Sequence, residues 1–257
     1  MPYCHLVFTL PHALNALALW HPRWVYRTLM QCTAATLTEF AANPRWLGAT
    51  GAFTLVLHSW TQDLRLHLHV HAVMACGGLD ALGVWVAPKR SASFLSPVHA
   101  LSKVFRAKFI AALRRAQDCG ELDHDPSHTP QTQQARLHEL TRHDWVVYAK
   151  TPLGGPEVVL DYLSRYTHRV AISNERLVGI ANNAVHLRVR ADDQGGKRTI
   201  TLDGPTFIAR FLQHLLPSGF KRIRHYGLLS PALKTQCEPP RISWRLVGLS
   251  QAATAEA

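Results

Sequence analysis

The chain has 257 residues, of which 47% are hydrophobic and 18% charged, and this composition excludes a disordered protein and supplies enough apolar material for a large core. The formal net charge of +11 favours a polyanionic partner, either nucleic acid or an anionic membrane. Five scattered cysteines without a CxxC pair exclude a disulfide framework and a zinc ribbon. No apolar run approaches the roughly 18 residues of a membrane span. We therefore expect a soluble, intracellular protein.

The first half of the chain alternates between predicted strands and helices. Pro22 and Pro97 stand at positions that suit the first turn of a helix, and Gly120 can end one. Period-two alternation indicates strands, which are bounded by prolines, glycines and polar turns. The predicted strands span 5–10, 52–60, 66–74 and 84–87, and the predicted helices span 12–20, 22–42 and 96–120.

The second half contains more short strands. A polar segment at 121–135 is predicted to be a loop or linker. After it we predict a strand at 144–150, a turn and helix at 154–169, short strands at 170–173, 176–181, 184–190 and 198–202, and a helix at 204–216. These elements predict an α+β fold with a central, mainly antiparallel sheet flanked by helices. Residues 1–230 would form one domain, and residues 231–257 a poorly ordered tail.

The segment 66–73 reads LHLHVHAV, which places His67, His69 and His71 at every second position. A β-strand turns successive side chains to opposite faces, so the three imidazoles line one face and the intervening apolar residues line the other. Neutral imidazoles that converge on one side of a strand are good metal ligands. A solvated strand face that is merely rich in histidine is the alternative interpretation.

Two tyrosines lie in the predicted helix at 154–169. Tyr162 and Tyr166 are four residues apart, so both phenols project from one helical face, although tyrosines at this spacing are also common in cores. Near a metal ion, a tyrosine can attack a phosphodiester and become covalently linked to DNA. At pH 7 only about one phenol in a thousand is ionised, and ionisation costs about 4 kcal/mol, which a nearby metal and cations can offset.

Four segments together resemble the two-tyrosine HUH transposases of rolling-circle insertion sequences: LHSWTQDLRLHLHVHAV, WVVYAK, GGPEVVLDYLSRYTHRVAISN and GFKRIRHYG. The opening HLVFTLPH also looks like the first strand of that family's catalytic domain. HUH denotes histidine, a bulky apolar residue and histidine. His69-Val70-His71 fits this position best, although His67-Leu68-His69 also satisfies the pattern.

The resemblance implies a metal site and two nucleophiles. It implies that His69 and His71 bind Mg²⁺ or Mn²⁺ on a central antiparallel sheet, and that the helix with the two tyrosines lies across this sheet. Related enzymes add a third, oxygen-bearing ligand, for which Gln62 is the tentative candidate. Asp63 and His67 are alternatives to Gln62. A structural role is expected for two further histidines, His5 and His58.

The implied activity is that of a rolling-circle transposase. One tyrosine would cut single-stranded DNA at an element end, leaving a 5′-phosphotyrosine, and the other would serve the second strand transfer to the target. The expected location is the prokaryotic cytoplasm, at the nucleoid when bound to DNA, without membrane contact. Candidate phosphate contacts, each of which could equally be a solvated surface charge, are Arg165, Arg169, Lys221, Arg222 and Arg224.

The chain also departs from the family's pattern. Members usually carry a cysteine-rich zinc-binding domain in front of HLVFTLPH, whereas this chain begins at that strand and has no CxxC pair. A truncated element is therefore one expectation, and a non-catalytic DNA-binding remnant is an alternative function. A plasmid or phage replication initiator with the same chemistry is the other alternative. The sequence predicts neither the recognised DNA nor the oligomeric state.

Overall fold

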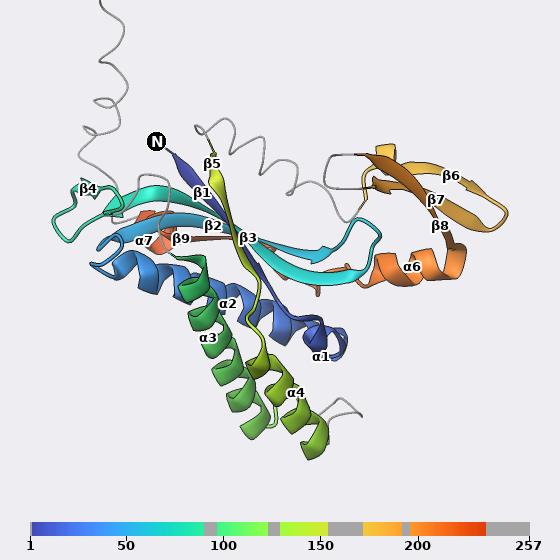
Figure 1. Ribbon diagram of the computed structural model, residues 1–257, viewed down its shortest axis with the longest axis horizontal. Helices are drawn as coiled ribbons and strands as arrows, with labels where there is room; N and C mark the ends of the chain where they lie inside the picture. Colours follow the sequence, from blue (N-terminus) through green and yellow to red (C-terminus); the bar gives the residue numbers. More distant parts are fainter. Residues whose placement is uncertain (1, 90–96, 123–128, 154–171, 192–195, 235–257) are drawn as a thin grey trace, which may run out of the picture.

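The computed structural model describes residues 2–89, 97–122, 129–153, 172–191 and 196–234 (Figure 1). Within these ranges the fold is α+β, with two antiparallel sheets and several helices, which confirms the predicted fold class. None of the described helices is both long enough and apolar enough to cross a bilayer.

The first sheet has the strand order β5-β1-β3-β2-β9, and the short β4 pairs with β3. Every pairing is antiparallel. β2 and β3 are joined by a short turn, whereas β9 reaches β2 from far along the chain. The strands are β1 (Tyr3–Thr9), β2 (Thr50–Trp60), β3 (Leu66–Leu79), β4 (Trp85–Val86), β5 (Val147–Leu153) and β9 (Ile223–Gly227).

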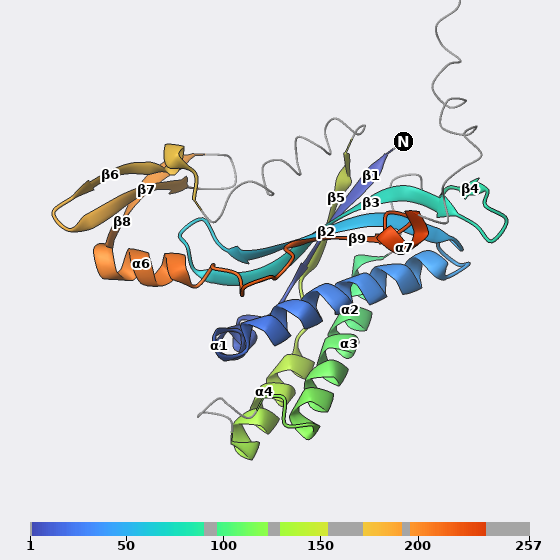
Figure 2. The same ribbon diagram turned by 180° about the vertical axis from the view of Figure 1, so that it is seen from behind.

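Helices cover one face of this sheet (Figures 1 and 2). They are η1 (His12–Leu14), α1 (Asn15–Trp20), α2 (Pro22–Ala42) and α3 (Val98–Asp118), and α4 (Pro130–Arg142) packs beside α3. Phe8 of β1 and Phe105 of α3 are fully buried, with ring centroids 5.2 Å apart. Leu55 and Leu68 of the two central strands are also fully buried. Each such side chain contributes about 1.5–3 kcal/mol, so this face of the sheet holds the main core.

Two sequence predictions are wrong in this part of the chain. The segment 121–135 is not a loop throughout, because α4 begins at Pro130. The Thr129 hydroxyl accepts the N–H of Thr132, and the Thr129 N–H donates to the Thr132 hydroxyl, which forms a capping box. The predicted strand at 170–173 is also absent from its two described residues, Ile172 and Ser173, which precede η2 (Asn174–Arg176).

The second sheet has the order β6-β7-β8, with β6 (Leu177–Ala181), β7 (Ala184–Arg190) and β8 (Lys197–Asp203), followed by α6 (Gly204–Leu212). Its small core contains Val185, Leu187 and Leu64, the last of which comes from the turn between β2 and β3. Arg210 donates to the carbonyl oxygen of Asp63 at 3.0 Å. Through Leu64 and the carbonyl oxygen of Asp63, the β2–β3 turn of the first sheet therefore contacts the second sheet and α6.

The chain returns to the first sheet through β9, and α7 (Pro231–Lys234) follows. Gly227 ends β9 with φ +60°, and a Cβ there would lie 1.8 Å from the carbonyl oxygen of Gly51 on β2. Glycine is needed at this point because both the conformation and the close backbone approach exclude a side chain.

Candidate metal centre

The histidine row lies on the face of the first sheet opposite the helices. His67, His69 and His71 alternate along β3 with Leu68 and Val70, which are fully buried on the helix side. β3 lies between β1 and β2 in the sheet order, so side chains of both neighbouring strands flank the row. The predicted separation of imidazoles and apolar residues onto two faces is therefore confirmed.

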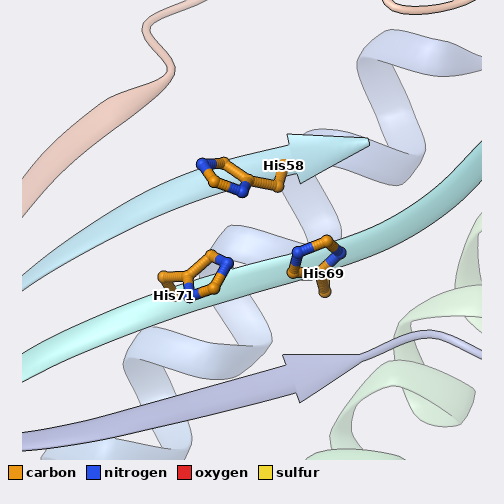
Figure 3. Close-up of side chains that lie close together, drawn as sticks. All are labelled: His58, His69 and His71. Atoms are coloured by element: carbon orange, nitrogen blue, oxygen red, sulfur yellow. The ribbon is translucent and has the colours of Figure 1, made fainter. Parts of the chain in front are cut away.

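His58 of β2 joins two members of this row. Its backbone lies opposite His69 in the β2–β3 register. One ligand atom from each of His58, His69 and His71 lies within 4.8 Å of the other two, and Figure 3 shows the three rings on the same side of the two strands. The sequence suggested a structural role for His58, whereas the structure places it beside the HUH pair.

Hydrogen bonds orient two of the imidazoles. The Nδ1 of His69 lies 2.9 Å from the carbonyl oxygen of His67, so Nδ1 donates and Nε2 keeps its lone pair for a metal. The Nδ1 of His71 lies 2.9 Å from Nε2 of His5, and the two rings stack with an interplanar angle of 8°. A metal-bound histidine usually donates its other ring N–H to such a partner. His5 and the His67 carbonyl are therefore placed to support the ligands.

Burial keeps His69 uncharged before a cation arrives. Burial lowers the pKa of His69 to about 4, although the hydrogen bond to the His67 carbonyl opposes this shift, so this imidazole is neutral at pH 7. Burial and the nearby His12 also lower the pKa of His67. Tetrahedral coordination at about 2.1 Å needs ligand nitrogens about 3.4 Å apart, so small side-chain rotations would close the observed spacing onto a metal. The donor set thus fits a divalent cation.

The predicted third ligand, Gln62, lies in the β2–β3 turn. Its side-chain oxygen accepts the backbone N–H of Arg190 on the second sheet at 2.5 Å. Asp63 forms an ion pair with Arg65 at 2.7 Å. The Nδ1 of His67 lies 3.1 Å from the Nε2 of His12, at the exposed end of the row. The geometry brings His58 to the HUH pair and gives these three candidates other partners, although their roles as ligands stay predictions.

The predicted nucleophiles Tyr162 and Tyr166, together with Arg165 and Arg169, lie outside the described residues. The other predicted phosphate contacts lie beside or within β9. Lys221 is exposed, the guanidinium of Arg222 lies 5.6 Å from the centre of the Trp60 ring, and that of Arg224 lies 4.9 Å from the centre of the Phe220 ring.

A mainly antiparallel sheet that carries an HUH pair on the face opposite its helices is the arrangement expected for two-tyrosine HUH proteins. The comparison with protein families agrees with this class. The chain belongs to the family described as "Putative transposase", which matches residues 51–237.

Two bacterial relatives are described as transposases. "Putative transposase y4qJ" of Sinorhizobium fredii is 44% identical over 240 residues, which cover 91% of this chain and 60% of the relative. "Transposase for insertion sequence element IS801" of Pseudomonas savastanoi pv. phaseolicola is 29% identical over 249 residues, which cover 89% of this chain and 54% of the relative. The chain therefore spans little more than half the length of these relatives.

Solved structures of the conjugative relaxase TrwC in complex with OriT DNA are also similar. The metal-free complex has 16% identity and a TM-score of 0.36, and the match covers 62% of this chain and 71% of the relaxase. The metal-bound complex has 15% identity and a TM-score of 0.37 over 62% of this chain and 69% of the relaxase. At these scores the likeness says nothing about the site of this chain.

Proposed function

We propose that this chain is a rolling-circle transposase that cuts and rejoins single-stranded DNA through a 5′-phosphotyrosine, with residues 1–230 as its catalytic domain in the prokaryotic cytoplasm. Membership of the transposase family supports the general activity. The observation that carries the chemistry is the group of three imidazoles, from His58, His69 and His71, on the face of the sheet opposite the helices.

His58, His69 and His71 would hold a divalent ion, which would neutralise charge on the scissile phosphate. The sequence resemblance favours Mg²⁺ or Mn²⁺. Of these two, three nitrogen donors favour Mn²⁺, because Mg²⁺ strongly prefers oxygen ligands. His5 and the carbonyl of His67 keep the rings of His71 and His69 turned toward the same point.

Tyr162 or Tyr166 would supply the nucleophile. The phenol oxygen forms a bond to phosphorus, the bond from phosphorus to the 3′-oxygen breaks, and the proton lost by the phenol ends on the 3′-hydroxyl. The 5′-phosphate stays on the tyrosine, so the energy of the broken bond is kept for rejoining. Lys221, which is exposed beside β9, with Arg222 and Arg224, would contact the backbone of the bound strand.

A covalent adduct tests this proposal. The protein is incubated with fluorescent single-stranded DNA of the element ends and Mn²⁺, and denaturing gels are used to detect DNA-linked protein. The Tyr162→Phe/Tyr166→Phe double variant keeps both rings and lacks both nucleophiles, so it should form no adduct while it still binds DNA and metal. If this variant still forms a denaturant-resistant adduct, or if products carry a free 5′-phosphate, activated water rather than tyrosine cuts the strand.

A further inference from the structure

The second sheet has two unlike faces. One face packs on α6 and on Leu64 of the β2–β3 turn, through Val185 and Leu187 of β7. The outward-turned residues of β7 and β8 form the opposite face, called here the basic face. These residues are His186, Arg188, Arg190, Lys197, Thr199 and Thr201, and the Ala184–Asp203 pair completes the face at the end beside α6.

The basic face gathers three cationic side chains on two neighbouring strands. Arg188, Arg190 and Lys197 are exposed, and within the described ranges none of them forms an ion pair. Arg190 lies directly opposite Lys197 in the β7–β8 register, and like charges at such positions destabilise a sheet. A polyanion lying across the two strands would relieve this repulsion, so the face is better suited to a ligand than to bare solvent.

The chemistry of the face distinguishes between kinds of nucleic acid. Surfaces that bind single strands stack the bases on aromatic side chains, and the basic face has no Phe, Tyr or Trp. Arginine, lysine and threonine hydroxyls are the groups that contact phosphates along a duplex. We propose that the basic face binds the phosphate backbone of double-stranded DNA, as a surface separate from the metal centre.

The second sheet is also tied to the strands that carry the histidines. The backbone N–H of Arg190 donates to the side chain of Gln62, and the Nε2 of His214 lies 3.2 Å from the carbonyl oxygen of Leu64. A duplex on the basic face would therefore be held next to the β2–β3 hairpin, whose strands carry His58 and His69. Its use in cleavage rests on the proposed function, whereas duplex binding itself needs neither metal nor tyrosine.

The test measures binding by fluorescence anisotropy in EDTA, with a blunt DNA duplex and one of its single strands. The variant Arg188→Ala/Arg190→Ala/Lys197→Ala removes the three cations of the basic face. Its duplex affinity should fall about a hundredfold at about 0.1 M salt, and the slope of log affinity against log salt should become shallower by about 2.7, or about 0.9 per lost phosphate contact. Its affinity for the single strand should change by less than about threefold, since Lys221, Arg222 and Arg224 remain.

The matched control is Lys103→Ala/Arg114→Ala/Arg115→Ala, which removes the same charge from exposed positions of α3. It should leave duplex binding unchanged, and thermal melting of both variants checks the fold. Thr199→Asp places a carboxylate opposite Arg188 without removing a cation, and it should also weaken duplex binding. Equal losses in the two triple variants, or an equal loss of single-strand and duplex affinity, would overturn the proposal. Because EDTA removes the metal ion, these binding measurements test the basic face even if the proposed tyrosine mechanism is wrong.

Discussion

Replacing His58 by phenylalanine should weaken metal binding without disturbing the sheet. His58 is only 3% exposed and its ring stacks on Trp60, with centroids 4.7 Å apart and an interplanar angle of 18°. Phenylalanine keeps this stacked ring and removes both ring nitrogens. The sequence alone, which gave His58 a structural role, predicts no change in metal affinity, so the variant separates the sequence-based hypothesis from the structural one.

The expected size of the effect follows from the number of ligands. Loss of a partner that only supports a ligand typically costs 10–100-fold in metal affinity, and His58→Phe removes one of the three proposed ligands. We therefore expect the Mn²⁺ dissociation constant to rise at least tenfold, which corresponds to about 1.4 kcal/mol or more. His69→Ala and His71→Ala should show losses of the same order.

Isothermal titration calorimetry with Mn²⁺ measures these constants directly. His225→Ala is the matched control, because His225 lies on the neighbouring β9, hydrogen-bonds Thr54 at 2.9 Å and lies outside the three-histidine group. Wild-type affinity in His58→Phe, together with a loss in His69→Ala, would refute the role of His58. A loss in Gln62→Ala instead would identify Gln62 as the third ligand.

Three further predictions concern stability and DNA binding. Burial lowers the pKa of His69 to about 4, so the unfolded chain takes up a proton at this histidine before the folded chain does as the pH falls. Urea melts in EDTA should therefore show the free energy of unfolding falling by up to about 2 kcal/mol between about pH 7.5 and about pH 5. The fall should be smaller in His69→Ala. Gly227→Ala should lower the free energy of unfolding by about 2 kcal/mol or more. Gly219→Ala is the control: Gly219 also has a positive φ, +72°, but a Cβ there would meet no atom within 4 Å, so it should lower this free energy by only about 1 kcal/mol. Equal losses would contradict the role of the Gly51 contact. Lys221→Ala should reduce the salt slope for single-stranded DNA by about 0.7 relative to Lys103→Ala, and an unchanged slope would remove Lys221 from the binding surface.

The sequence determined the features that depend on neighbouring residues. Alternation along one strand sufficed to place His69 and His71 on one face and Leu68 and Val70 on the other, because successive side chains of a strand always point to opposite sides. Pro22 similarly marked the first residue of α2. The exposed helix α4 was missed because its start depends on the capping pair Thr129 and Thr132, in a segment without an apolar pattern.

Only the tertiary structure brought His58 to the metal centre. Trp60 pairs with Leu66, and continuous pairing from there would set His58 opposite Leu68, a core residue. A register shift between His58 and Trp60 instead sets His58 opposite His69. Neither this register shift nor the hydrogen bond from the Arg190 N–H to the Gln62 side chain can be predicted from a local pattern. Both depend on segments that meet only when the chain folds. Alternation along β3 thus placed His69 and His71 on one face from sequence, while pairing between strands added the third imidazole, that of His58.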